Sequence, residues 1–292
     1  MKQYFHYCSK GLKSDVLFAN PTEFIAGMNR VAICYLICLR NDRKVLIISF
    51  CLMDNHVHFI LYGTRADCDA FVSDYKRLSC IWIRNNRKER LHDIIDFGDG
   101  YPISTRESLK EKIAYVLRNP IAAGINLTPA GYRWGTGGLM FSDNAWLMAS
   151  ARHLSEISQH ALFELFSTRQ DFPGEWTVLN DGLIWPGCYT ETDVAMRQFN
   201  SVGDYLFCIN DSRIDRKTNE EMFGHMTSIP DGEIKDHAKS LANSLFNKNY
   251  TSKCTPGERI EIARCLIIDY SCGHKQLARV LGLKEEDLKL LV

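Results

Sequence analysis

Two histidines in this sequence of 292 residues are separated by a single residue, within the segment MDNHVHF at positions 53–59. Side chains alternate along a β-strand, so His56 and His58 would project from one face while Val57 and Phe59 enter the opposite layer. Imidazole nitrogens bind divalent metals, and two of them beside a turn form half of a cation site. The competing interpretation is a pair of histidines on a solvated or partly buried sheet face.

A second group of reactive residues is YVLRN at positions 115–119. Tyr115 and Asn119 are four residues apart and would lie one above the other on a helix. A phenol is a useful nucleophile toward phosphodiesters because the phosphotyrosine ester stores the bond energy for rejoining. Its ordinary pKa is about 10, so a cation that polarises the scissile phosphate would assist it. The competing interpretation is that Tyr115 is a core aromatic residue and Asn119 a C-cap before Pro120.

The elements that would position both groups follow the order β-α-β-β-α. Aromatic and apolar runs indicate the strands, and apolar periodicity with capping residues indicates the helices. We expect a strand at 2–9, a helix beginning at 20–23, a hairpin or strand pair from 45–53 and 56–62, a helix at 66–88, a loop at 91–104 and a helix at 104–119 that Pro120 ends. This order predicts an α+β fold with a small antiparallel sheet and helices on one face.

Beyond Gly138 the pattern changes to helical segments separated by Gly, Pro and Asn. Three short helices are predicted near 257–270, 273–281 and 284–291, with Gly282 in the last turn. A helix-turn-helix would have this spacing, and so would any compact helical tail. The would-be recognition helix opens with three consecutive acidic residues, which repel phosphates, so we expect at most weak binding of duplex DNA by this tail.

Length and composition fit a folded chain of one or two domains, with 46% hydrophobic and 24% charged residues. We expect a boundary near 140–150, which gives a catalytic region at 1–145 and a mainly helical region at 146–292. The eleven cysteines are odd in number and include no Cys-x-x-Cys pair. They are therefore expected to be reduced core residues rather than a disulfide or zinc framework.

The formal net charge is zero, which by itself argues against a nucleic-acid partner. Residues 1–145 nevertheless carry 19 Lys+Arg against 14 Asp+Glu, a net +5, and residues 146–292 carry 16 against 21, a net −5. The positive half contains a basic run within 76–90, which includes a single acid, Glu89. On charge alone, a solvated helix face is the preferred interpretation of this run.

No apolar run approaches the roughly 20 residues that span a bilayer, and the N-terminus lacks the regions of a signal peptide. We therefore expect a cytoplasmic protein with no membrane partner.

Several of these motifs together resemble a known family. The segment 53–61 and the segment YVLRNPIAAG at 115–124 resemble two signatures of REP-associated tyrosine transposases, which belong to the HUH superfamily of single-strand DNA transposases. Tyr132-Arg133-Trp134 is similar to a further element of that family. The resemblance covers about residues 1–145, and it departs from the family pattern at Asp54 and at Gly135-Thr136.

The resemblance implies a ferredoxin-like sheet that carries the histidines, with the tyrosine helix alongside and Mg²⁺ or Mn²⁺ between them. It implies that His56, His58 and Asn119 bind the metal and that Tyr115 is the nucleophile. It also gives the basic residues a role in binding DNA phosphates. This predicted DNA-binding set comprises Lys76, Arg77, Arg84, Arg87, Lys88, Arg90 and Arg118.

The function expected from the resemblance is nicking and joining of single-stranded, hairpin-forming DNA by transesterification. Tyr115 would attack a phosphate and retain the 5′-phosphate as an ester, and a free 3′-OH would leave. The alternative is a sequence-specific DNA-binding protein that uses its C-terminal helices and has an idle active site. A metal-dependent hydrolase ranks lowest because the sequence offers no evident general base or further ligands. Monomer and dimer both remain open.

Overall fold

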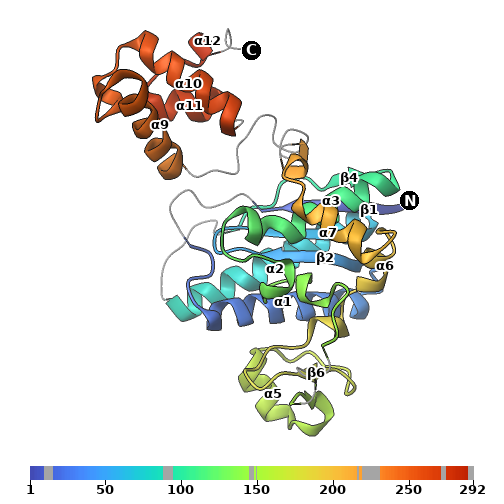
Figure 1. The fold of residues 1–292 in the computed structure, drawn as a ribbon. Coiled ribbons are helices and arrows are strands. Elements are labelled where there is room, and N and C mark those ends of the chain that lie inside the picture. The colour runs from blue at the N-terminus through green and yellow to red at the C-terminus, as the bar shows by residue number, and fades with distance from the viewer. Residues whose placement is uncertain are drawn as a thin grey trace. The chain divides into compact units, whose positions relative to one another are not determined.

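The structure, a computed structural model, describes residues 1–9, 16–87, 95–144, 148, 150–215, 217–218, 231–270 and 274–288. Its internal contacts divide the chain into unit 1, Met1–Asp211, and unit 2, Ser212–Val292 (Figure 1). The boundary expected near residue 145 therefore lies inside unit 1. The reason is that residues between 154 and 189 contribute large apolar side chains to the same core as the central sheet.

Unit 1 begins with a β-α-β-β-α-β unit. Its elements are β1 (Lys2–Cys8), α1 (Pro21–Arg40), β2 (Leu46–Leu52), β3 (Val57–Thr64), α2 (Arg65–Arg87) and β4 (Tyr101–Ile103). The four strands are antiparallel and lie in the order β2-β3-β1-β4. This connectivity and strand order are those of a ferredoxin-like sheet, so the α+β class predicted from the sequence is confirmed.

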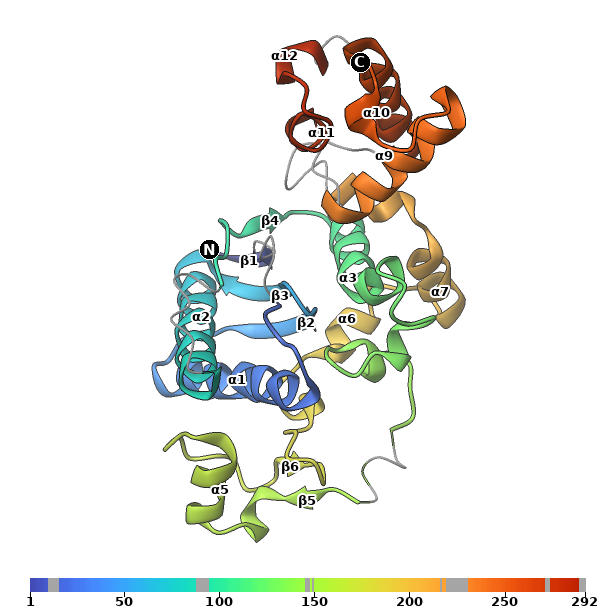
Figure 2. The same ribbon diagram turned by 90° about the vertical axis from the view of Figure 1, so that its left-hand side faces the viewer.

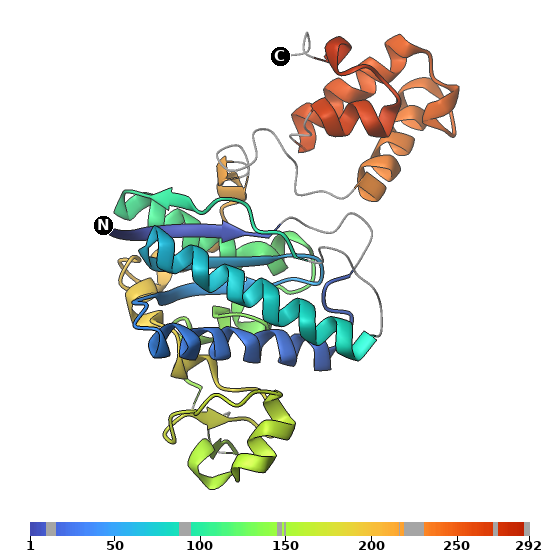
Figure 3. The same cartoon turned by 180° about the vertical axis from the view of Figure 1, so that it is seen from behind.

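Helices cover both faces of this sheet. Phe59 on β3 contacts the rings of Phe71 and Tyr75 on α2, and α1 lies beside α2 on the same face (Figures 2 and 3). The opposite face is covered by α3 (Arg106–Ala122), which contacts β2 and β3. The expectation that the helices lie on one face is therefore met by α1 and α2, whereas α3 lies on the other face. Because β3 is buried along nearly its whole length, its second face also requires a cover.

Strand β4 lies within the segment 91–104, which was predicted to be a loop. Residues 91–94 of this segment lie outside the described part of the chain. Its three residues pair with Tyr4–His6 of β1 at the edge of the sheet. A strand this short has no measurable period, and Pro102 weakens the signal further. Proline is tolerated here because an edge strand does not need every backbone N–H for pairing.

Helix α1 is long and apolar enough to span a bilayer, although no such segment was expected from the sequence. An 18-residue window in its 20 residues has a mean hydropathy of 1.4, which reaches the range of membrane-spanning helices. The protein itself buries 72% of that window, and α1 packs against α2 and β2. A buried core helix and a spanning helix satisfy the same criteria of length and composition, so the cytoplasmic location stays a prediction.

The rest of unit 1 consists of short elements. They are η1 (Pro129–Gly131), η2 (Gly137–Leu139), β5 (Arg152–His153), η3 (Leu154–Glu156), α5 (Gln159–Phe166), β6 (Thr177–Val178), η4 (Pro186–Cys188), α6 (Thr192–Met196) and α7 (Val202–Asn210). Strands β5 and β6 form a separate two-stranded sheet. Asn29 on α1 attaches this region, because its side chain donates to the carbonyl of Gly182 at 2.8 Å and accepts from the N–H of Ile184 at 2.9 Å.

The segment that contains Tyr132-Arg133-Trp134 runs along the outer edge of β2. The N–H of Leu52 donates to the carbonyl of Trp134 at 2.8 Å, and the N–H of Thr136 donates to the carbonyl of Phe50 at 3.0 Å. A Cβ on Gly135 would lie 2.6 Å from that same carbonyl oxygen, so only glycine fits this close approach. Gly135 and Thr136 therefore cover the edge of β2, which would otherwise be exposed.

Unit 2 is helical and has a core of its own. It contains α9 (Asp231–Phe246), η5 (Thr251–Lys253), α10 (Pro256–Tyr270), α11 (His274–Leu281) and α12 (Glu285–Leu288). Apolar side chains such as Ile234, Leu266 and Leu277 are fully buried in it. The three helices predicted near the C-terminus are confirmed over the described residues, and Gly282 adopts a φ of +64° in the last turn.

Candidate metal and nucleophile site

The two histidines of the His-x-His pair lie together on the face of the sheet that α3 covers. His58 is the second residue of β3, and His56 directly precedes the strand. Their ring centroids are 4.8 Å apart and their planes are nearly perpendicular, at 89°. His58 is buried and His56 is half-buried. The pair therefore forms one side of a compact polar cluster between the sheet and α3.

Asn119 faces this pair from α3. Its Oδ1 lies 3.3 Å from Nε2 of His56. Its Nδ2 donates to the carbonyl of Tyr115 at 2.9 Å and is 3.5 Å from the carbonyl of Val116. Because two carbonyls accept from the amide nitrogen, the amide oxygen is the atom directed toward the imidazole.

The same contacts explain why α3 continues to Ala122 instead of ending before Pro120 as predicted. A proline at this position lacks the N–H that would bond to the carbonyl of Val116 four residues earlier. The side-chain amide of Asn119 lies against that carbonyl and the neighbouring one. The residue that faces the histidines thus also supports the helix through its proline.

The hydrogen bonds of His56 leave one ring nitrogen available. Its Nδ1 is 2.6 Å from Oδ1 of Asn55, an acceptor, so Nδ1 carries the proton. Burial lowers the pKa of His56, although the contact with Asn119 partly opposes this, so the ring is neutral near pH 7. The lone pair of Nε2 and the oxygen of Asn119 then face each other at 3.3 Å. Two acceptors at this distance favour a cation between them, and bonds of about 2.0–2.2 Å to each would fit.

His58 is oriented by a residue that sequence reasoning missed. Its Nδ1 lies 3.1 Å from Nε2 of His6 on β1, and both rings are buried. Burial lowers the pKa of both histidines, and for His6 burial and the nearby ammonium of Lys112 together lower it to about 3. Two neutral rings share this bond as one donor and one acceptor. When Nδ1 of His58 donates, its Nε2 carries the free lone pair that a metal requires.

Tyr115 contacts both of these histidines. The centroid of its ring is 5.4 Å from that of His58 and 5.7 Å from that of His6, both in edge-on geometry. The side chain is 6% exposed. Tyr115 and Asn119 are thus brought to one site, as their spacing predicts for a helix.

Lys112 lies on the same helix three residues before Tyr115 and is 1% exposed. Its Nζ is 5.3 Å from the ring centroid of Tyr101. The i,i+3 spacing on α3 is a signal from which this residue could have been found. No comparable signal exists for His6, because 52 residues separate it from His58 and only the β1–β3 pairing brings them together.

Tyr101 and Tyr132, the tyrosines nearest to Tyr115 in the sequence, occupy different positions. Tyr132 is buried, and its hydroxyl donates to the carbonyl of Leu52 at 2.7 Å. Tyr101 is a member of β4 and not of a loop, and it lies directly opposite His6 in the register. Opposed residues of antiparallel strands share a face, so Tyr101 borders the cluster, whereas the Tyr115 ring contacts the imidazoles themselves.

The predicted DNA-binding residues do not gather around this cluster. The α2 residues lie on the helix that covers the opposite face of the sheet. Arg87 pairs with Glu23 and also donates to the carbonyls of Val16 and Leu17, so it holds the start of α1. Arg118 is on α3, but it is buried and donates to the carbonyl of Ile209 at 2.7 Å.

The remaining members of that set are surface residues or lie outside the described chain. Lys76 and Arg77 form ion pairs with Asp96 and Asp74, at 3.5 and 3.1 Å. Arg84 is exposed. Lys88 and Arg90 fall within residues 88–94, outside the described residues. An electrostatic groove leading to the histidines is therefore not formed by the described members of this set.

The donor set of the cluster is two imidazoles and one amide oxygen. Within the described ranges, no group of three or more His, Cys, Asp and Glu side chains is placed to hold a metal ion. His56, His58 and Asn119 still fit a divalent cation, because Nε2 of His56 lies 3.3 Å from Oδ1 of Asn119, the ring of His58 lies beside that of His56, and anchoring hydrogen bonds occupy the other polar atoms of these residues. Imidazole nitrogens suit Zn²⁺, Cu²⁺, Fe²⁺ and Ni²⁺, and an amide oxygen also suits Mg²⁺ and Mn²⁺.

Comparisons with known proteins add a distant likeness. No protein-family model matches the sequence. No curated protein matches it either. A solved structure of a REP-associated tyrosine transposase bound to a REP hairpin is similar over 47% of this chain and 78% of that chain, with 11% sequence identity and a TM-score of 0.33. The ferredoxin-like assignment rests on the strand order of this protein and not on that likeness.

Proposed function

We propose that unit 1 nicks and joins single-stranded DNA by metal-dependent transesterification, with Tyr115 as the nucleophile. The observation that carries this proposal is the convergence of Tyr115 and Asn119 from one helix on His58 and His56. A rigid helix fixes the distance between a nucleophile and the group beside it, which lowers the cost of orienting them for reaction. The transposase-like reaction would take place at this cluster of tyrosine, asparagine and histidine side chains.

Each metal-binding side chain would be held by a second group. Asn55 orients His56, His6 orients His58, and the carbonyls of α3 orient Asn119. Such outer contacts select the tautomer and reduce the motion of ligands. Mg²⁺ or Mn²⁺ bound by these three residues would polarise the scissile phosphate and stabilise its developing charge.

The covalent step would proceed as follows. The phenolic oxygen of Tyr115 forms a bond to phosphorus as the bond between phosphorus and the 3′-oxygen breaks. The phenolic proton is lost and the leaving 3′-oxygen gains one, so the proton count is unchanged. Lys112, on the same helix, would contribute positive charge near His6 and Tyr101, at the border of the cluster. Attack of a 3′-OH on the ester reverses these steps and rejoins the strand.

A second candidate is a DNA-binding protein whose cluster is idle. The observation that favours it is burial, because Tyr115 is only 6% exposed and Sγ of Cys8 lies 3.8 Å from Nε2 of His58. A substrate phosphate would have to reach this enclosed phenol. The helical unit 2 would then carry the binding function.

A denaturing gel distinguishes the two candidates. Wild-type protein is incubated with a labelled single-stranded DNA hairpin and Mn²⁺ or Mg²⁺, and a covalent adduct is sought. Tyr115→Phe should abolish the adduct and leave binding of the same DNA nearly unchanged, and Tyr101→Phe is the matched control. Absence of an adduct with wild-type protein over a range of hairpins and both metals, with DNA binding retained, would favour the idle site.

A further inference from the structure

Arg30 on α1 is a buried cation whose charge no acid neutralises among the described residues. Arg30 is 6% exposed, and its Nη1 donates to the carbonyl of Ala26 at 3.3 Å. The guanidinium carbon lies 5.5 Å from the ring centroid of Trp82. Burial lowers the pKa of Arg30 to about 10, so the group is still charged at neutral pH. A carbonyl and an aromatic face compensate this buried charge only in part.

Two arginines of the neighbouring helix α2 contrast with Arg30. Arg77 pairs with Asp74, and Arg87 pairs with Glu23. An unpaired charge in the interior is unfavourable unless a partner arrives, and guanidinium groups bind carboxylates and phosphates through two parallel hydrogen bonds. Arg30 is therefore suited to an anion from outside the described chain.

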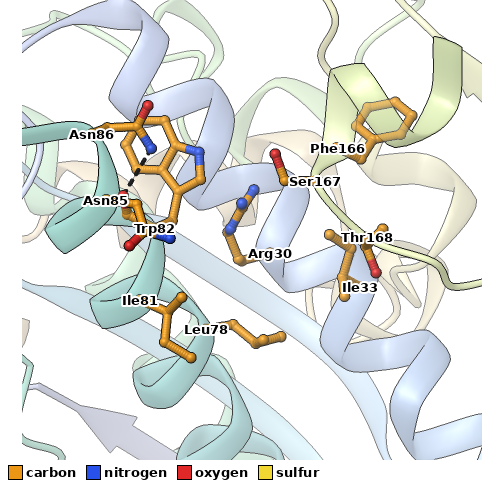
Figure 4. A pocket seen from close by; sticks show the side chains of 10 residues that line it. All are labelled: Arg30, Ile33, Leu78, Ile81, Trp82, Asn85, Asn86, Phe166, Ser167 and Thr168. Atoms are coloured by element: carbon orange, nitrogen blue, oxygen red, sulfur yellow. Dashed lines mark hydrogen bonds between the residues drawn. The ribbon is translucent and has the colours of Figure 1, made fainter. Parts of the chain in front are cut away.

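A cavity of about 190 Å³ gives such an anion access to Arg30 (Figure 4). In this view, Arg30 rises from α1 between Trp82 on α2 and Ser167 at the end of α5. Ser167 and Thr168 offer hydroxyl groups, and Asn85 on α2 offers an amide. Apolar side chains, including that of Ile81, form the remainder of the wall. The lining thus combines one cation, a few neutral donors and an aromatic surface.

We propose that this cavity binds a small organic acid, whose carboxylate or phosphate group pairs with Arg30 and whose apolar body lies against Trp82. The cavity volume of about 190 Å³ would hold several water molecules. It is below the range of about 300 Å³ and more that is typical of drug-sized ligands, so the ligand has one small ring or a short chain.

A DNA strand fits this cavity less well. A phosphodiester carries a sugar on each side, and both sugars would have to remain outside a cavity of about 190 Å³. Helices α1 and α2 also lie across the sheet from His56 and His58. The acid site is therefore separate from the proposed nuclease site, and Tyr115→Phe should leave it unaffected.

Thermal unfolding of the full chain tests this proposal, with benzoate and phenyl phosphate as probes at constant ionic strength. At least one of the two acids should raise the Tm of wild-type protein in a saturable manner. The neutral analogues benzamide and benzyl alcohol should not. Arg30→Met should weaken the apparent affinity at least tenfold, and Arg84→Met, which alters an exposed arginine of α2, should not. Inorganic phosphate shows whether the oxyanion alone suffices to raise the Tm.

Arg30→Lys keeps the charge but not the forked geometry, and it provides a second test if Arg30→Met does not fold. It should also weaken binding of the acid, as measured by equilibrium dialysis with labelled benzoate. Three results would overturn the proposal. They are an absence of any saturable shift in wild-type protein, an equal shift in the Arg30 variants, and stabilisation through Arg30 by a single-stranded oligonucleotide but by neither acid.

Discussion

Replacing Asn119 by alanine removes the two contacts that this side chain makes, one toward His56 and one to its own helix. The substitution removes the Oδ1 atom that faces His56 at 3.3 Å and the Nδ2 atom that donates to the carbonyl of Tyr115 at 2.9 Å. The contact with Val116, at 3.5 Å, is at the limit of a hydrogen bond. One good bond and one weak bond to the helix are lost, which together cost about 1–2 kcal/mol.

This cost is small compared with the roughly 5–15 kcal/mol that stabilises a typical folded protein. For a unit of the size of Met1–Asp211 it corresponds to a decrease in Tm of roughly 2–8 °C. Asn119→Ala should therefore fold. Loss of one of three donors should in contrast weaken Mn²⁺ binding, by at least the roughly 10–100-fold that even outer contacts contribute.

The assay measures Tm and adduct formation as functions of Mn²⁺ concentration, for wild-type protein and for the variant. Asn119→Asp is the matched control, because it retains an oxygen and adds charge but loses the amide donor. It should lower the Tm without metal and regain stability as Mn²⁺ is added. Identical dependence on Mn²⁺ in wild-type protein and Asn119→Ala would refute a ligand role for this residue.

Three further predictions concern other parts of the chain. Peptide mapping of a trapped adduct should identify Tyr115, and a modified Tyr101 would move the nucleophile to β4. His6→Asn should lose less stability than wild-type protein as the pH falls. The pKa of His6 is about 3 in the folded state and about 6.5 in the unfolded state, so only the unfolded state gains a proton on this side chain between these values. The folding free energy that neutral His6 contributes is therefore complete above about pH 6.5 and is lost as the pH falls toward about 3. Tm values between pH 7.5 and 4.5 test this, and parallel curves would contradict it. Residues 212–292 should bind duplex DNA weakly in a mobility-shift assay, because α12 has only four helical residues and presents exposed acids; tight, salt-sensitive binding would show otherwise.

Periodicity along the chain was sufficient to predict the main elements around the cluster. The helices α1, α2 and α3 and the β2–β3 pair were expected from local patterns, and an antiparallel sheet was expected from the succession of these elements. The shared orientation of His56 and His58, and that of Tyr115 and Asn119, also required no tertiary information. Side-chain direction within a strand or a helix depends on residue spacing alone, which explains why these expectations agree with the structure.

Short elements and the partners of polar side chains were decided by the tertiary structure. The register that places Cys8 opposite His58 is what brings His6 to the site, and β4 exists through its pairing with β1. Basic residues illustrate the same limit, because Arg87 and Arg118 were expected to contact DNA but donate to backbone carbonyls. A guanidinium has the same charge whether it meets a phosphate, a carbonyl or an aromatic ring. Only packing between segments distant in sequence determines which of these it meets, since burial makes each donor require a partner.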